Sequence, residues 1–160
     1  MELSADKFKV NAFSINQGKA KGEYFFGVNT NDKTGRIVKT GDPNTTVLQI
    51  KKVNIGEDTY AFMAENYMPK DGSGKNAYLV AKSDGKVTIE YLADVKVEKG
   101  AHFSSLPAFT KADGAEQFLS FESKLKPGFF LRHAGLVLYI HPLDPSELYK
   151  QDASWMIQKM

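Results

Sequence analysis

The sequence has no cysteine among its 160 residues. A disulfide framework, a thiolate zinc site and a cysteine nucleophile are therefore excluded. The longest apolar run, 136–140, is far too short to cross a bilayer, and residues 1–9 lack the apolar core of a signal peptide. We expect no membrane insertion, and a protein that is cytoplasmic or is secreted without a visible signal peptide.

The sequence also has little net charge and no helical pattern. The formal net charge is +2, and no Lys/Arg cluster stands beside a patch of aromatic residues, so a nucleic-acid partner is not expected. No window of helical length carries a sustained apolar period of 3.6 residues. Aromatic residues reach 12%, which favours strands, so the expected fold class is all-β.

Short strands recur along the chain with turn residues between them. The strongest local signal is a hairpin formed by 77–82 and 86–91, because Asp84-Gly85 lies between two alternating segments. Elsewhere the pattern predicts a strand over 46–52, a strand continuing through Val95 and Val97, a short irregular segment over 102–109, and polar loops or turns over 17–22, 70–76, 111–116 and 141–152.

Internal repeats distinguish a barrel from a sandwich. Residues 78–81 with their turn superpose on 130–133, residues 62–69 superpose on 120–127, and 24–27 begin a fainter third copy. Three copies of about fifty residues with four strands each are the signature of a β-trefoil. We therefore predict twelve strands and a single β-trefoil domain over 1–160, with pseudo-threefold repeats at about 5–56, 57–110 and 111–160. The predicted core includes Phe62, Leu79, Ile89, Phe121, Leu131, Leu138 and Trp155.

The third repeat carries three spaced motifs. They are Phe-Leu-Arg-His over 130–133, Pro-x-Asp-x-Ser over 142–146 and Asp-Ala-Ser-Trp over 152–155. This pattern resembles the arabinofuranose-binding β-trefoil domain of arabinofuranosidase B enzymes, and the resemblance implies that His133 and Asp152 line a sugar pocket. Pro145 stands where that family has Gly, and Ala134 follows the His where a pocket aromatic can stand. The first two repeats lack the Arg-His pair, so at most one pocket is expected.

We expect His133 and Asp152 to lie within about 6 Å of each other, so that one sugar hydroxyl can bridge them. Tyr149 and the Asp144 loop are expected to wall the pocket. The plainer alternative is a hairpin histidine paired with a loop carboxylate. A metal site built from His133, Asp144, Asp152 and the nearby His141 has no compact ligand spacing, so solvated loop residues are the better interpretation.

A second resemblance lies in the same repeat. Phe121-x-Ser123, then Pro127, then Phe130-Leu131, is similar to the signature of interleukin-one family cytokines. That resemblance implies a protein receptor as the alternative partner, although Arg132 and the next residue replace the small residues that usually follow.

Nothing in the sequence indicates catalysis. No Gly-x-Ser-x-Gly elbow exists, and no pair of carboxylates stands out as a glycosidase pair. We therefore expect a non-catalytic, lectin-like protein without a cofactor, which binds a glycan or small sugar through His133, Asp152, Asp144 and Tyr149. A cytokine-like or other protein-binding trefoil is the alternative.

Overall fold

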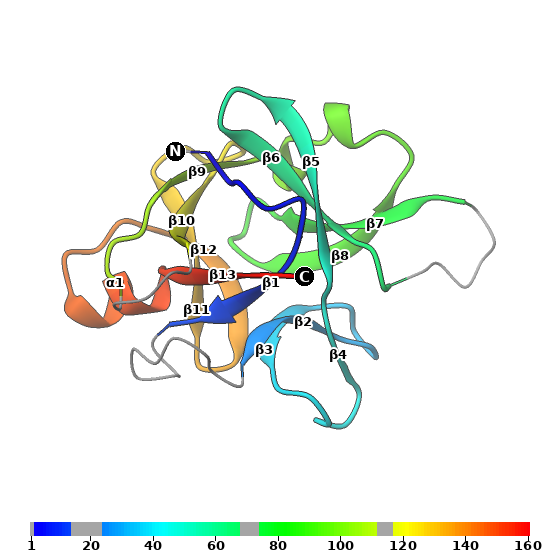
Figure 1. Cartoon of the computed structure of the whole chain (residues 1–160), viewed down its shortest axis with the longest axis horizontal. Coiled ribbons are helices and arrows are strands. Elements are labelled where there is room, and N and C mark those ends of the chain that lie inside the picture. Colours follow the sequence, from blue (N-terminus) through cyan, green and yellow to red (C-terminus); the bar gives the residue numbers. More distant parts are fainter. Residues whose placement is uncertain (1, 14–23, 68–73, 112–116) are drawn as a thin grey trace.

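The computed structural model describes residues 2–13, 24–67, 74–111 and 117–160. Strands dominate this part of the chain, with two 3-10 helices and one short α-helix (Figure 1). The strands are β1 (Lys7–Ala12), β2 (Phe25–Asn29), β3 (Gly35–Val38), β4 (Thr45–Val47), β5 (Ile50–Gly56), β6 (Thr59–Ala64), β7 (Asn76–Ala81), β8 (Val87–Leu92), β9 (Phe103–Pro107), β10 (Gln117–Ser123), β11 (Phe129–Ala134), β12 (Val137–Pro142) and β13 (Trp155–Lys159). The helices are η2 (Val95–Val97), η3 (Lys99–Ala101) and α1 (Glu147–Asp152).

Six strands close into a barrel. In order around the ring, β1 pairs with β5, β5 with β6, β6 with β9, β9 with β10, β10 with β13, and β13 with β1. Closure leaves no free edge in the ring, which removes the exposed strand edges that a single repeat would have. Each repeat gives its first and last strand to this barrel.

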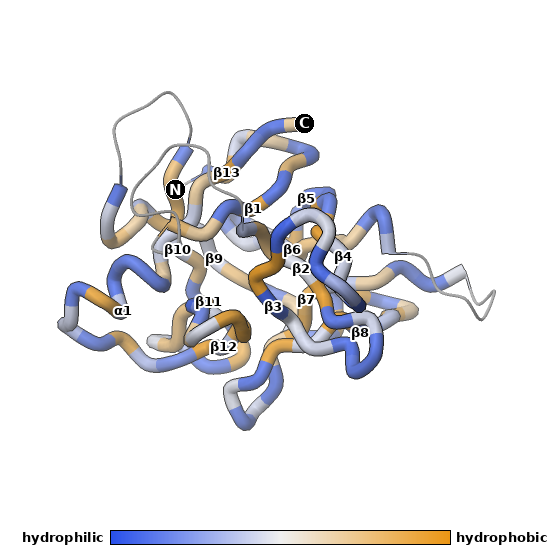
Figure 2. The backbone as a smooth tube through the Cα atoms, turned by 90° about the horizontal axis from the view of Figure 1, so that it is seen from below, coloured by the Kyte–Doolittle hydropathy of each residue, from blue (hydrophilic) through white to orange (hydrophobic). Residues whose placement is uncertain are grey.

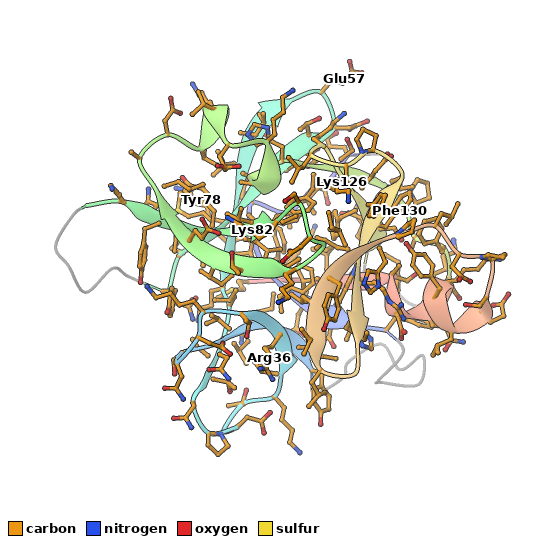
Figure 3. All side chains as sticks on the ribbon, turned by 180° about the vertical axis from the view of Figure 1, so that it is seen from behind. Arg36, Glu57, Tyr78, Lys82, Lys126 and Phe130 are labelled. Carbon is orange, nitrogen blue, oxygen red and sulfur yellow. The ribbon has the colours of Figure 1, made fainter. Side chains whose placement is uncertain are left out.

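Three hairpins cover one end of the barrel. They are β2–β3, β7–β8 and β11–β12, marked in Figure 3 by Arg36, Lys82 and Phe130. Each hairpin touches the next through a single bridge, at Arg36 with Val137, Thr34 with Thr88, and Lys86 with Tyr139. Six barrel strands with three capping hairpins form the predicted β-trefoil.

The core lies where barrel and hairpins meet, while hydrophilic stretches gather at turns and along α1 (Figure 2). Every predicted core residue is at most 1% exposed, which confirms that set. The Phe62 ring stacks on Phe103 at 5.5 Å and meets Phe121 edge-on at 5.0 Å. Trp155 packs against Phe26 with 4.5 Å between ring centroids, and its indole N–H donates to Leu131 O at 3.2 Å.

The strand pairings also fix how the repeats align. Met63 pairs with Tyr78 and Glu122 pairs with Phe130, so the predicted match of 78–81 with 130–133 is confirmed. The same pairs make Phe62 equivalent to Phe121. The predicted match of 62–69 with 120–127 aligned Phe62 with Ser120, so it is wrong by one residue. An error of one residue would exchange the two faces of the strand.

Four local expectations differ from the structure. The strand expected over 46–52 is divided into β4 and β5, with the fully buried Leu48 between them. This division gives the described residues thirteen strands instead of the predicted twelve. The segment at Val95 and Val97 is the helix η2, in which Val97 is 78% exposed and Asp94 accepts from the N–H of Lys96. Residues 103–107 form β9 instead of an irregular segment, and the expected loop 141–152 contains α1. The expected loops at 17–22, 70–73 and 112–116 lie outside the described residues.

In the described ranges, no helix has the length and apolar character needed to cross a membrane.

Trp155→Ala should lower the free energy of unfolding by roughly 3–5 kcal/mol, because it leaves a large cavity at the centre of the core. Leu143→Ala is the matched surface control, since Leu143 is 57% exposed, and it should change stability by about 0.5 kcal/mol or less. Denaturant unfolding monitored by circular dichroism measures both. Equal stabilities of the two variants would contradict a central role for Trp155.

Candidate functional site

His133 and Asp152 meet beside a cavity in the third repeat. His133 lies near the end of β11 and Asp152 is the last residue of α1. The imidazole Nε2 is 3.4 Å from the carboxylate Oδ1, and each residue is only 5% exposed. The predicted proximity of the pair is therefore confirmed. The cavity measures about 430 Å³ and is lined by Arg132, His133, Ala134, Gly135, Leu148, Gln151 and Asp152.

The helix α1 is fixed at both ends, and this places Asp152. The Ser146 hydroxyl accepts from the N–H of Tyr149 and caps the first turn. The Tyr149 hydroxyl donates to His141 O at 2.8 Å, which attaches the helix to β12. After the helix, the Ser154 hydroxyl donates to Lys150 O at 2.7 Å, and Ser120 donates to Ala153 O at 2.7 Å.

Arg132 holds the Asp152 carboxylate in place. Its Nη2 lies 2.5 Å from Asp152 Oδ2, its Nε donates to His133 O at 3.2 Å, and Nη1 is 3.4 Å from His141 Nδ1. The guanidinium also lies over the Tyr149 ring at 5.2 Å from the centroid. A charge held by a carboxylate, a backbone carbonyl and an aromatic face has little freedom to move, so Asp152 is orientated before any ligand arrives.

The tautomer of His133 follows from its partners. Nδ1 is 3.0 Å from Gly135 O, and a carbonyl only accepts, so Nδ1 carries the proton. Burial, with a smaller effect from Arg132, holds the pKa of His133 below its usual value near 6.5, although Asp152 and the Gly135 carbonyl act in the opposite direction. At neutral pH the imidazole is therefore uncharged. Its Nε2 and the Asp152 Oδ1 are both acceptor atoms, which is an arrangement suited to the O–H donors of a ligand.

Tyr149 and Asp144 do not line the cavity, so their predicted place as its walls is corrected. Tyr149 is 3% exposed and lies behind Arg132, and burial raises its pKa to about 12. Asp144 is exposed, and its carboxylate accepts from the N–H of Ser146 at 2.8 Å, which holds its pKa below the usual range. A contact of either residue with a ligand remains a prediction. The observed walls are Leu148, Gln151 and the residues after His133.

No three His, Cys, Asp or Glu side chains within the described residues come together as a metal site. His141, one member of the metal set weighed from the sequence, lies against the Arg132 guanidinium. Burial, followed by this positive charge, lowers its pKa.

The first two repeats differ at the same positions. Strand pairing places Trp155, Phe103 and Ile50 at the same position in the last barrel strand of the third, second and first repeat. Three residues earlier, Asp152 of the third repeat therefore corresponds to Gly100 of the second and Val47 of the first. In the second repeat a Cβ on Gly100 would lie 2.4 Å from Ala81 O, and Ala81 is the counterpart of His133. Backbone packed on backbone leaves no room for a ligand there.

The first repeat differs from the third in another way. Val47 lies in β4 and pairs directly with Gly27 of β2, which is the counterpart of Arg132. A strand ladder therefore occupies the place where the third repeat has α1 and a cavity. Both arrangements agree with the expectation of at most one pocket of this kind.

The residues of the cytokine-like signature are mostly buried. Phe121, Ser123 and Leu131 are fully buried and Phe130 is 7% exposed. The Ser123 hydroxyl accepts from the N–H groups of Leu125 and Lys126 and so shapes the turn before β11. These residues encode the fold, and a receptor surface elsewhere on the chain remains a prediction.

Gly100→Ala should destabilise the protein by about 1–3 kcal/mol, because the added methyl group collides with the backbone of β7. Gly56→Ala is the matched control, since a Cβ there meets nothing within 4 Å, and it should stay within about 0.5 kcal/mol of the original protein. Thermal unfolding compares the two variants. A harmless Gly100→Ala would mean that the second repeat has open space at this position.

The free energy of unfolding should fall as the pH is lowered from about 7 to about 5. The pKa values of His133 and His141 are lower in the folded chain than in the unfolded chain, so the unfolded chain binds protons first and gains stability relative to the fold. His133→Asn keeps a donor for Gly135 O and should flatten this dependence. Denaturant titrations at several pH values measure the free energy of unfolding of both proteins. If it depends on pH equally steeply in His133→Asn and in the original protein, the lowered pKa of His133 is contradicted.

The chain was compared with known protein families and solved structures, and both comparisons agree with the fold described above. The family model of the alpha-L-arabinofuranosidase B (ABFB) domain matches residues 73–159, which is more than half of the chain. Among curated proteins, no relative matches.

Three solved structures share the fold. An arabinofuranosidase complexed with arabinofuranosyl-alpha-1,2-xylobiose has a TM-score of 0.68 and 14% identity, over 99% of this chain and 32% of that one. A GlcNAcα1-4Gal-releasing endo-β-galactosidase from Clostridium perfringens has a TM-score of 0.65 and 11% identity, over 96% of this chain and 32% of that one. The designed threefold symmetric protein ThreeFoil has a TM-score of 0.58 and 11% identity, over 97% of this chain and 99% of that one.

The chain spans about a third of the length of the two glycosidases, and identities this low show the fold alone. The family is shown by the match over residues 73–159, which contains the whole third-repeat cavity. The chain therefore belongs to the alpha-L-arabinofuranosidase B (ABFB) domain family.

Proposed function

We propose that this protein is a non-catalytic carbohydrate-binding module that holds one sugar residue in the third-repeat cavity. The observation that carries the proposal is the Asp152 carboxylate, fixed by Arg132 and facing His133 Nε2 at the cavity. The membership of the chain in a domain family named after an arabinofuranosidase supports the same conclusion.

The cavity offers the two kinds of contact that a sugar needs. On the polar side, Asp152 and His133 accept from hydroxyl groups, and the Gln151 amide can donate or accept. On the apolar side, Leu148 and Ala134 offer surface for the C–H groups of the ring. A few fixed polar groups in a mostly apolar hollow are typical of small-molecule sites. Each charge-assisted bond contributes about 1.5–3 kcal/mol before other costs, so one such pocket should bind near the millimolar range.

The number of carboxyl groups in the cavity lining supports binding without catalysis. Glycoside hydrolysis ordinarily uses two carboxyl groups about 5–9.5 Å apart, one of which donates a proton. The described residues that line the cavity include a single carboxyl group, Asp152, which is paired with Arg132. One carboxyl group can accept hydrogen bonds from a ligand, but it lacks the second carboxyl group that this hydrolysis uses.

Arabinose-containing glycans are the first ligands to test, and galactose-containing glycans are the second. The arabinofuranosidase with the same fold was solved with arabinofuranosyl-alpha-1,2-xylobiose, which is a property of that protein and guides the choice here. Binding to such glycans would attach the protein to a polysaccharide that carries arabinose or galactose units.

Asp152→Asn should abolish binding to arabinose- or galactose-containing glycans while the fold survives, because the amide removes the charge and reverses one hydrogen-bond role. Asp84→Asn is the matched control and should bind like the original protein, since Asp84 is exposed in the turn between β7 and β8 and lies outside the cavity lining. A glycan array followed by calorimetric titration measures both variants, with circular dichroism as the check on folding. A blank array, or equal binding by Asp152→Asn, would overturn the proposal and make the protein-receptor alternative the leading one.

A further inference from the structure

A second cavity, of about 310 Å³, lies in the first repeat. Its lining includes Lys9 of β1, Lys39 and Thr40 after β3, Thr45 and Thr46 of β4, and Gln49. It shares no residue with the third-repeat cavity, and β4 and α1 lie at different edges of the molecule (Figures 1 and 2). Nothing in the proposed sugar site uses these residues.

The charge of this cavity is one-sided. Two lysines line it, its lining contains no carboxyl group, and neither lysine forms an ion pair with any described residue. A neighbouring cavity at the start of β1 has a different balance, because Asp6 lines it and Lys7 Nζ is paired with Glu65 at 3.0 Å. Within the described ranges, the two lysines of the first-repeat cavity therefore have no ion-pair partner, whereas Lys7 beside them has one.

Each of the two ammonium groups lies over an aromatic ring. Lys9 Nζ lies 5.7 Å from the centroid of Phe25, and Lys39 Nζ lies 5.9 Å from that of Tyr24. The turn that carries Lys39 is closed by its own N–H, which donates to Asp42 Oδ2 at 3.2 Å, and by the Asp42 N–H, which donates to Lys39 O at 3.1 Å. Asp42 thus fixes the turn without lining the cavity. Held side chains lose less conformational entropy when they bind a ligand.

Hydroxyl and amide groups complete the wall. Thr45 is engaged in the turn, where its hydroxyl donates to Asp42 O at 2.9 Å. Thr40, Thr46 and Gln49 add two hydroxyl groups and an amide to the lining. The cavity is larger than a bare ion and lies at the lower end of the size range of small-molecule sites, about 300–1,000 Å³. A single charged and hydroxylated ring fits this size and chemistry.

We propose that the first-repeat cavity binds an acidic sugar, with Lys9 and Lys39 contacting its oxyanion. The oxyanion is the carboxylate of a uronic acid or the ester of a sulfated sugar, because an ammonium group is a point charge that accepts either geometry. Thr40, Thr46 and Gln49 contact the sugar hydroxyl groups. This site works independently of the third-repeat cavity, so the two proposals stand or fall separately.

The test is an NMR titration of the isotope-labelled full chain with glucuronate, galactose 6-sulfate, glucose, galactose and inorganic sulfate. Saturable shifts confined to the amides of 39–41 and 45–47 are expected with one or both acidic sugars and not with the neutral sugars. Glucuronate and the sulfate ester distinguish the two sources of the oxyanion. Higher salt should weaken the binding, because the attraction is electrostatic and exposed to solvent.

The variant Lys9→Gln/Lys39→Gln should bind the acidic sugar at least about tenfold more weakly, since it removes both charge-assisted contacts. Lys96→Gln/Lys124→Gln is the matched control, because it removes the same net charge from exposed positions outside the cavity. Asp152→Asn should leave this binding unchanged, which separates the result from the third-repeat site. Shifts with inorganic sulfate alone, equal shifts with neutral sugars, or equal affinity in the two double-lysine variants would overturn the proposal.

Discussion

Trp155 links the core of this trefoil to its surface chemistry. The indole packs against Phe26 of the first repeat, donates to the backbone of β11 at Leu131, and meets the His133 ring edge-on at 5.9 Å. One large side chain thus connects the β11–β12 hairpin of the third repeat to β2 of the first repeat. Because Asp152 lies three residues before Trp155 and His133 lies two after Leu131, the same packing fixes the separation of the two cavity residues.

The polar residues around the cavity depend on one another in a similar way. Arg132 satisfies Asp152, and Tyr149 supports Arg132 from behind while its hydroxyl attaches α1 to β12. A buried carboxylate without its cation would be costly, and a buried guanidinium without its carboxylate would be equally so. Tyr149, which was expected from the sequence to wall the pocket, therefore has a supporting role, because it contacts the arginine that holds the carboxylate.

The sequence predicted the fold because the information was local and repeated. Alternating apolar residues, the Asp84-Gly85 turn and three similar copies determine a trefoil, and the buried set from Phe62 to Trp155 follows from alternation alone. Short segments were harder, because η2 and α1 are too short to show a helical period and depend on caps at Asp94 and Ser146. A missed one-residue shift between repeats had no local signal, and only strand pairing reveals it.

The candidate site was predictable in part. The resemblance of the third repeat to the arabinofuranose-binding domain implied His133 and Asp152, and superposing the repeats placed the two residues where they can meet. Arg132 stands beside His133 in the Phe-Leu-Arg-His motif and was not predicted as a site residue. Alternation places neighbouring residues of a strand on opposite faces, so it gives no signal that Arg132 contacts the site. Its side chain is long enough to reach back to Asp152. The lysine cavity had no sequence signal, since Lys9 and Lys39 come from segments thirty residues apart.

If the third-repeat cavity binds a sugar as proposed, the protein is monovalent for that sugar, because the described parts of the first and second repeats have no counterpart of this cavity. A polysaccharide that repeats the same sugar unit would then occupy one such pocket per copy, so the chelate effect that strengthens multivalent lectins would not act within the domain. Retention on such a polymer would depend on rebinding, or on a tether that brings copies together and raises their effective concentration. A weak, single pocket of this kind would release its ligand quickly, which would let the protein move along a polysaccharide surface and sample it.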